Sequence, residues 1–190
     1  MEMIKSVGVF CAASESIDEA FVEQARLVGS LIGRKGLTLV YGGAAAGLME
    51  ATAAAAKESG AHIVGVFPQV LIERNRVSAL LDECVVTQNL SDRKDNILSR
   101  SDVLVALPGG VGTIDEIFHV AAAHTIGYHS KKVILYNVNG FWDKMLEFLQ
   151  GLQQQGFIRA RFEALFGVAD NIHTNQSHPD CLYLLSVPEA

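Results

Sequence analysis

Short continuous apolar runs alternate with amphipathic stretches along most of the chain. These runs lack the polar alternation of half-exposed strands, which is typical of strands buried on both faces of a parallel sheet. We also expect a short edge strand within the segment from Phe166 to Ile172. The main strands are predicted at Val7–Cys11, Leu37–Tyr41, His62–Val66, Cys84–Thr87, Val103–Leu107 and Lys132–Tyr136.

The stretches between these strands carry apolar residues at helical spacing. In the first of them, Asp18 precedes such a stripe and is the expected N-cap of a helix that runs to about Arg34. Alternating strands and helices predict one doubly wound α/β domain, with a mostly parallel sheet and helices on both faces. The further helices are expected at about Leu48–Ser59, Val70–Leu81, Ser91 or Asp92 to Arg100, Ile114–Ile126 and Phe141–Gln155.

Composition agrees with a single folded domain. The chain has 190 residues, of which 49% are hydrophobic and 19% are charged, so a sizeable core can be buried. No linker or repeat interrupts the pattern, and we predict one nucleotide-binding domain over residues 1–176 with a peripheral C-terminal tail over residues 177–190. A net charge of −6 gives no electrostatic footprint for a nucleic-acid partner.

The compartment is expected to be the cytoplasm. The start of the chain has no basic segment followed by an apolar one, and no apolar run is long enough to span a bilayer, so we expect no signal peptide and no membrane partner. Cys11, Cys84 and Cys181 are odd in number and lack metal-ligand spacing. We predict that they are buried free thiols in a reducing compartment.

Two glycine-rich turns are the candidate ligand-binding elements. Gly42–Gly47 and Gly109–Gly112 each follow a predicted strand and precede a predicted helix, so both lie at the carboxyl edge of the sheet, where ligands bind. Bare amide groups at a helix N-terminus favour a phosphate. We therefore predict a phosphate-bearing ligand at Gly109, Gly110, Val111, Gly112 and Thr113, with Gly42 and Gly43 on the same edge.

Several common site types are absent from the sequence. The first turn, Cys11–Ser14, has no glycine and the second strand ends in Tyr41, so the usual dinucleotide fingerprint is missing. Neither glycine turn is followed by the Lys-Ser or Lys-Thr pair of a Walker motif. The histidines His62, His119, His124 and His129 do not form a ligand set, and we predict no metal and no cofactor.

Glu116 has two interpretations. Thr113 and Glu116 have the T-x-x-E spacing of a capping box, in which the glutamate only satisfies backbone donors, and spacing alone favours this role. A position near a helix N-terminus would also keep the Glu116 carboxylate ionised near neutral pH. Ionised, it could stabilise an oxocarbenium ion or orient a water beside a sugar phosphate.

Arg93 and Lys94 are unfavourably placed for two adjacent cations, because they lie near the positive end of a helix dipole. They are neutralised by Asp92 and Asp95 on a solvated face, or they reach over the sheet edge toward an anion. Both interpretations stay open at the level of sequence.

Several motifs resemble one known family. Tyr41–Met49 is similar to its YGGxxxGLM segment, Arg93-Lys94 to its RK pair, and Pro108–Glu116 matches PGGxGTxxE at every fixed position. GxHxK and GFI stretches follow near residues 127–131 and 156–158. The chain thus resembles the LOG (Lonely Guy) family of cytokinin riboside 5′-monophosphate phosphoribohydrolases, also described as possible lysine decarboxylases.

This resemblance implies a Rossmann-like fold, a homodimer or larger homo-oligomer, and hydrolysis of the N-glycosidic bond of a purine nucleoside 5′-monophosphate. It implies that Arg93 and Glu116 are catalytic, that the glycine loop holds the phosphate and ribose, and that Lys94 lies nearby. Asp115 is the weaker candidate for the role of Glu116. No redox cofactor or metal is required. None of the seven lysines has the context of a Schiff-base lysine, so lysine decarboxylation is not expected.

The chain departs from the family pattern around the expected base pocket. It has Arg74-Asn75 where many members have Arg-Glu, Ala122-Ala123-His124-Thr125 where many have Thr-Trp-Ala-Gln, and Cys-Ala-Ala-Ser at the end of the first strand. These changes point toward AMP or another purine nucleotide as substrate. The alternative is a non-catalytic nucleotide or molybdenum-cofactor carrier with a similar PGGxGT loop, against which the intact Arg93 and Glu116 argue.

Overall fold

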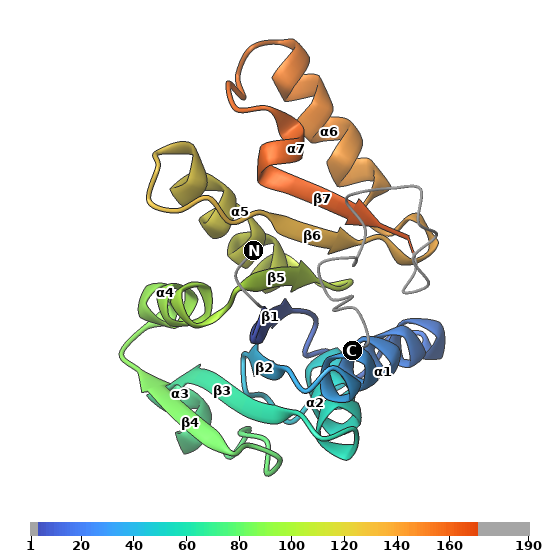
Figure 1. The fold of residues 1–190 in the computed structure, drawn as a ribbon, viewed down its shortest axis with the longest axis vertical. Coiled ribbons are helices and arrows are strands. Elements are labelled where there is room, and N and C mark those ends of the chain that lie inside the picture. The colour runs from blue at the N-terminus through green and yellow to red at the C-terminus, as the bar shows by residue number, and fades with distance from the viewer. Residues whose placement is uncertain (1–3, 171–190) are drawn as a thin grey trace.

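The computed structural model describes residues 4–170, which form one sheet flanked by helices (Figure 1). All pairs of neighbouring strands are parallel, in the order β4-β3-β2-β1-β5-β6-β7. The predicted Rossmann-like doubly wound fold is confirmed. The predicted tail at 177–190 lies outside the described residues. The strands are β1 Ser6–Phe10, β2 Thr38–Tyr41, β3 His62–Pro68, β4 Glu83–Thr87, β5 Val103–Ala106, β6 Val133–Tyr136 and β7 Phe166–Ala169.

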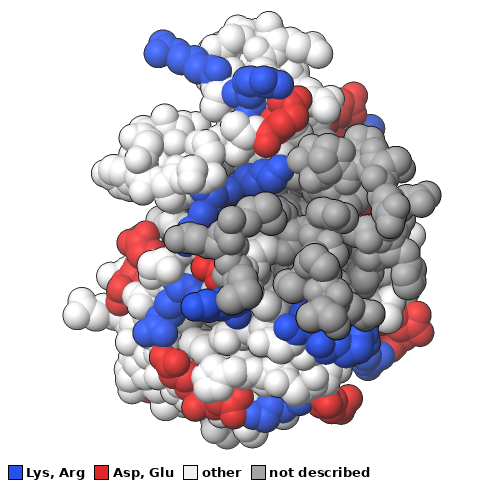
Figure 2. All heavy atoms as spheres, in the orientation of Figure 1, with Lys and Arg blue, Asp and Glu red and all other residues white. Residues whose placement is uncertain are grey.

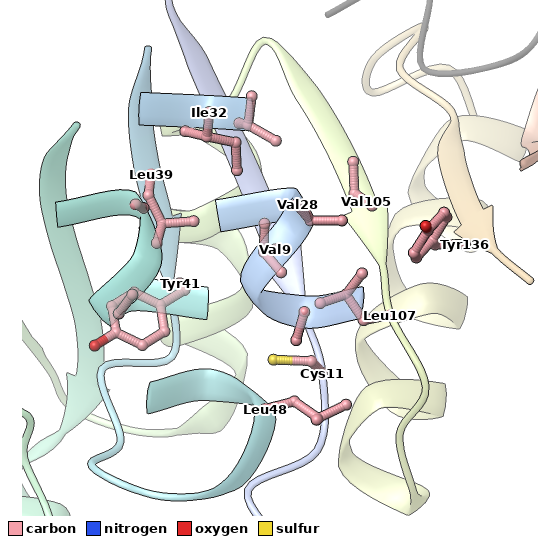
Figure 3. Close-up of a cluster of buried hydrophobic side chains, with 14 of the residues drawn as sticks. Val9, Cys11, Val28, Ile32, Leu39, Tyr41, Leu48, Val105, Leu107 and Tyr136 are labelled. Atoms are coloured by element: carbon pink, nitrogen blue, oxygen red, sulfur yellow. The ribbon is translucent and has the colours of Figure 1, made fainter. Parts of the chain in front are cut away.

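Helices cover both faces of the sheet because successive strand residues point to opposite sides. On one face, Val28 and Ile32 of one helix and Leu48 of the next pack against Val9 and other strand residues (Figure 3). On the other face, residues of four further helices pack against the alternate strand positions. The helices are α1 Glu19–Arg34, α2 Gly47–Glu58, α3 Gln69–Glu73, α4 Leu90–Arg100, α5 Val111–Thr125, α6 Asp143–Gln154 and α7 Phe162–Leu165, with a 3-10 turn η1 at Val138–Gly140.

The element types follow the sequence closely and the boundaries less so. Asp18 is the N-cap of α1, where its side chain accepts a hydrogen bond from the Ala20 amide at 2.9 Å, as predicted. The expected edge strand is β7, whereas α7 was not predicted. The helix predicted to reach Leu81 ends at Glu73, because the following segment turns back and pairs its backbone with the Gly42–Gly47 turn.

The strand order reverses between β1 and β5, which creates the crevice where such sheets bind ligands. Two backbone hydrogen bonds join the loops that leave these strands: Leu107 N donates to Phe10 O at 2.9 Å and Ala12 N to Pro108 O at 3.2 Å. At the opposite edge, the Asp102 carboxylate accepts from the amides of Lys5 and Ser6 at 2.8 and 3.0 Å. Both ends of the β1–β5 pair are therefore fixed.

The charged side chains on the visible face are mixed. In the part of Figure 2 not covered by grey atoms, lysines and arginines alternate with acids, and no broad basic area is seen. Among residues 4–170, every helix is too short or too polar to cross a lipid bilayer.

The close contact between α1 and α2 depends on a buried glycine. A Cβ atom added at Gly29 would overlap the carbonyl oxygen of Thr52, which is backbone and cannot move aside. We expect Gly29→Ala to lower the free energy of unfolding by about 1–3 kcal/mol, measured by urea denaturation. Gly151→Ala in α6 is the matched control, because a Cβ there meets open space. It should be neutral or stabilise by up to about 1 kcal/mol, and an equal loss in both variants would contradict the packing argument.

Candidate active site

A cleft of about 300 Å³ opens at the carboxyl ends of β1 and β5. The turn after β1 forms one side and the start of α5 forms the other. One side chain each from α2 and α4 completes the wall. The lining residues are Cys11, Ala12, Ala13, Ser14, Met49, Arg93, Gly110, Gly112, Thr113 and Glu116.

The two glycine turns of this edge have different roles in the fold. The amides of Leu48 and Met49 at the start of α2 donate to the carbonyl of Ala12 at 3.0 and 3.3 Å, so this helix end is already occupied. The amides of Val111, Gly112 and Thr113 at the start of α5 have no hydrogen-bond partner within residues 4–170. An anion in the cleft would therefore meet free donors at α5 and not at α2.

Arg93 is held in the cleft by three elements. Its Nε donates to the carbonyl of Val66 in β3 at 3.1 Å, and its Nη1 lies 3.2 Å from Oε1 of Glu116 in α5. A Cβ on Gly42 would overlap Nη2 of Arg93, so the glycine turn after β2 leaves room for the guanidinium. Glu116 is buried and Arg93 is partly buried, with side chains 4% and 14% exposed.

Glu116 is not the cap of a helix. The helix α5 begins at Val111, with Gly110 as its N-cap and no side-chain capping bond, so Thr113 is already inside the first turn. The capping-box interpretation is therefore wrong, because it required the helix to begin after Thr113. Glu116 is the sixth residue of the helix, and its carboxylate faces Arg93.

Burial raises the pKa of Glu116 from its ordinary value to about 7, although Arg93 opposes this shift. The neighbouring Asp115 raises the pKa further, and Lys94 lowers it. The loss of hydration disfavours the ionised carboxylate more than the ion pair with Arg93 favours it, which is typical of a carboxyl group removed from water. The expectation that helix position alone keeps Glu116 ionised at neutral pH is therefore wrong, since a substantial fraction is protonated near pH 7.

A second ion pair runs beside the first between the same two helices. Nζ of Lys94 in α4 lies 2.9 Å from both carboxylate oxygens of Asp115 in α5. The expected neutralisation by Asp92 and Asp95 does not occur: Asp92 accepts from Gln88 and Asn96, and Asp95 contacts His119. The Arg93-Lys94 pair thus turns toward α5, where each cation faces a carboxylate of that helix. That the pair reaches toward a bound anion stays a prediction.

The structure brings five of the eleven predicted site residues together in one cleft. Gly110, Gly112 and Thr113 line the cleft with Arg93 and Glu116, and Gly109 lies against the Thr113 side chain. Six predicted residues do not line it: Gly42, Gly43, Lys94, Gly109, Val111 and Asp115. Val111 is 85% exposed, and Lys94 and Asp115 form their ion pair beside the cleft. Gly42 lines an adjoining hollow. Gly43 packs on Phe67.

Sequence reasoning placed the turn after β1 near the expected base pocket but named neither its residues nor Met49 among the site residues. The signal was available, because the first strand of a doubly wound sheet borders the crevice. Cys11 is a buried free thiol, as predicted, and its pKa is raised far above its ordinary value by burial and by Glu116. It is therefore an unreactive wall residue. Cys84 is exposed, which corrects the prediction that it is buried, and Cys181 lies outside the described residues.

The chain is similar to proteins of one named activity. A family model described as "Possible lysine decarboxylase" matches residues 49–176. A Mycobacterium tuberculosis protein named cytokinin riboside 5′-monophosphate phosphoribohydrolase is 36% identical over 167 residues, with 88% of this chain and 89% of the relative covered. The Arabidopsis thaliana protein of the same name, LOG5, is 33% identical over 90% of this chain and 77% of its own.

Solved structures add a second kind of relative. The molybdenum cofactor carrier protein of Chlamydomonas reinhardtii superposes with a TM-score of 0.68 at 27% identity, covering 88% of this chain and 91% of its own. The molybdenum cofactor binding protein of Rippkaea orientalis has a TM-score of 0.65 at 23% identity, over 90% and 91% of the two chains, and shows the shared fold alone.

The raised pKa of Glu116 predicts a pH-dependent cost in stability. Between pH 4.5 and about 7 the folded state binds the proton of the Glu116 carboxyl group more tightly than the unfolded state does. The contribution of Glu116 to the free energy of unfolding therefore falls as pH rises through this range. We expect Glu116→Gln, which cannot ionise, to gain free energy of unfolding relative to the wild type from pH 5 to pH 8, by up to about 3 kcal/mol. Urea denaturation at four pH values measures this difference. A difference that stays constant with pH would contradict the raised pKa, and Glu147→Gln, at an exposed position, controls for the lost charge.

Proposed function

Because the chain belongs to the family of cytokinin riboside 5′-monophosphate phosphoribohydrolases described as possible lysine decarboxylases, we propose that it is a nucleotide N-glycosidase. Its substrate is a purine nucleoside 5′-monophosphate, with adenine or a prenylated adenine as the base. Hydrolysis gives the free base and ribose 5-phosphate. No metal or cofactor takes part in this proposal.

The observation that carries the proposal is the pair of Arg93 with the buried Glu116, beside a helix end with free amides. One cleft of about 300 Å³ contains two features. One is a helix end that can anchor a phosphate, and the other is a carboxyl group that titrates near neutral pH. A protein that only retained a phosphate would need the anchor alone. The pair has a direct use in glycoside cleavage, which passes through a cationic sugar.

In the proposed mechanism, the amides of residues 111–113 and the N-terminus of α5 bind the 5′-phosphate, and the glycines admit the ligand to the backbone. Arg93 orients the nucleotide. The ionised Glu116 stabilises the ribosyl cation or orients the attacking water. The bond between the base nitrogen and C1′ breaks, water supplies the oxygen at C1′, and the base leaves with a proton. Asp115 acts indirectly, since it holds Lys94 beside the loop.

The alternative function is that of a non-catalytic nucleotide or molybdenum-cofactor carrier. The observation that favours it is the structural similarity to the carrier protein of Chlamydomonas reinhardtii. Similar folds host unrelated functions, so the site must decide. Retention of a bound nucleotide without release of its base would support the carrier. The free thiols Cys11 and Cys84 fit the reducing cytoplasm that we propose as the compartment.

Lysine decarboxylation is not proposed. Two of the described lysines are engaged in the fold: Lys94, beside the cleft, pairs with Asp115, and Nζ of Lys131, just before β6, donates to the carbonyl of Leu98 at 2.8 Å. Neither is placed as a Schiff-base lysine in the cleft.

The decisive assay measures release of free base and ribose 5-phosphate from AMP and from isopentenyladenosine monophosphate. We expect kcat/KM to rise about tenfold per pH unit below pH 7 and to level off above it, since the ionised Glu116 is the active form. Glu116→Gln should lose activity by about 100-fold or more, and Asp115→Asn should lose less. No release from either nucleotide would sink the enzyme proposal. Release that survives Glu116→Gln would sink the role of the carboxylate.

We also propose that the protein is a homodimer or a larger homo-oligomer built on α5. Ile114, Phe118 and Ala122 form an exposed stripe at four-residue spacing on this helix, with Ile126 just beyond its end. Grooves of about 660 Å³ lie on both sides of the stripe. A second copy is the fitting occupant, because an apolar helix stripe can pack on its own two-fold mate.

Phe118→Asp tests this interface. We expect it to lower the mass in light scattering to that of a monomer, because an unpaired carboxylate would be buried at the contact. Phe148→Asp on α6 is the control, since this exposed phenylalanine lines neither groove and should leave the mass unchanged. A wild type that is already monomeric would contradict the proposal.

A further inference from the structure

A second hollow of about 390 Å³ adjoins the cleft. The two share Ala13, Met49 and Arg93, so they are continuous around the guanidinium of Arg93. A nucleotide with its phosphate at α5 and its glycosidic bond beside Arg93 and Glu116 places its base away from the loop. The hollow is lined by Ala13, Glu15, Gly42, Ala44, Ala45, Ala46, Met49, Leu71, Asn75, Arg76 and Arg93.

The far wall of this hollow is fixed by backbone contacts. Ala45 N donates to the carbonyl of Arg76 at 2.9 Å, Ser78 N donates to the carbonyl of Gly43 at 2.9 Å, and Ala44 and Val77 form an antiparallel bridge. The segment after α3 is therefore tied to the glycine turn that also accommodates Arg93. These contacts hold the residues of this segment at a fixed distance from Arg93 and Glu116.

Asn75 occupies a special position in this wall. Its φ of 53° lies in the left-handed region, and hydrogen bonds from Asn75 N to Ile72 O and from Arg76 N to Leu71 O hold the turn. Asparagine tolerates this conformation better than most residues. The side-chain amide has no hydrogen-bond partner within residues 4–170, although it lines the hollow. Its donor and acceptor are therefore available to a ligand.

The chemistry of the hollow fits a purine ring. Small apolar residues at positions 44–46 and the Met49 side chain offer apolar contacts to an aromatic ring. The asparagine amide carries one acceptor oxygen and an NH₂ donor, and this combination matches the N6–H donor and N7 acceptor of adenine. A 6-oxopurine presents two acceptors at the same edge, so the amide oxygen would lose its partner on binding.

We propose that Asn75 is a specificity residue that selects 6-aminopurine over 6-oxopurine nucleotides. This inference rests on the proposed nucleotide substrate. It applies equally to an N6-substituted adenine that retains one N6–H. Glu15, at the rim of the same hollow, adds a carboxylate that can accept from an amino group but not from a keto oxygen.

The left-handed backbone dictates the test variant. Asn75→Gly removes the amide and keeps φ accessible, whereas alanine would add backbone strain. Asn139→Gly is the matched control: it has the same φ of 53°, in η1, and lines neither hollow. We expect Asn75→Gly to lower kcat/KM for AMP by about tenfold and that for IMP by much less. The ratio of kcat/KM for AMP to kcat/KM for IMP then falls about tenfold, while Asn139→Gly leaves this ratio unchanged.

Calorimetric binding of AMP and IMP to the same proteins separates the two proposals. If the wild type releases base from none of AMP, IMP and isopentenyladenosine monophosphate, the N-glycosidase proposal fails, and the binding ratio of AMP to IMP alone decides the role of Asn75. Tighter binding of AMP than of IMP, lost in Asn75→Gly, supports the inference. A wild type without preference for AMP overturns it, as does an AMP:IMP ratio that is the same in wild type and Asn75→Gly.

Discussion

The contact between Arg93 and Glu116 is the constraint on which the site depends. A buried carboxyl group and a partly buried guanidinium lie 3.2 Å apart here, and burial of charges is costly unless several elements hold the geometry. The carbonyl of Val66 fixes the guanidinium from the sheet, and Gly42 gives it space. The start of α5 brings the carboxyl group to it. A neighbouring pair, Lys94 with Asp115, keeps α4 and α5 in register. The most costly burial of charge in the site therefore occurs where two helices and two strand ends converge.

The sequence predicted the fold well because a parallel sheet leaves a strong signal. Its strands are continuous apolar runs, and each is followed by a turn and a helix. The α3 boundary failed for a physical reason: the segment after Glu73 forms backbone pairs with residues 43–45, which no local periodicity records. Fine boundaries of this kind are set by tertiary contacts.

Parts of the site could also be predicted. The order of strands places Gly109–Thr113 and Gly42 on one edge, and an Arg-Lys pair at a helix start is a visible anomaly. What could not be predicted is which partner each charge takes. The T-x-x-E spacing suggested a cap, yet α5 begins at Val111, so the same glutamate turns inward. Its pKa depends on burial in the folded protein, which a motif does not contain. The difference between the two glycine turns likewise needs the carbonyl of Ala12.

The backbone of Ala12 has a consequence for how this site tolerates sequence change. Its N–H donates to the carbonyl of Pro108, ahead of the Gly109–Gly112 turn, and its carbonyl accepts from the amides of Leu48 and Met49 in α2. One peptide segment without a functional side chain therefore joins the two halves of the crevice. This connection uses only main-chain N–H and C=O groups, which every residue except proline supplies. The side chains of this turn can therefore change, as the Cys-Ala-Ala-Ser sequence illustrates, while the backbone that lines the cleft keeps its shape.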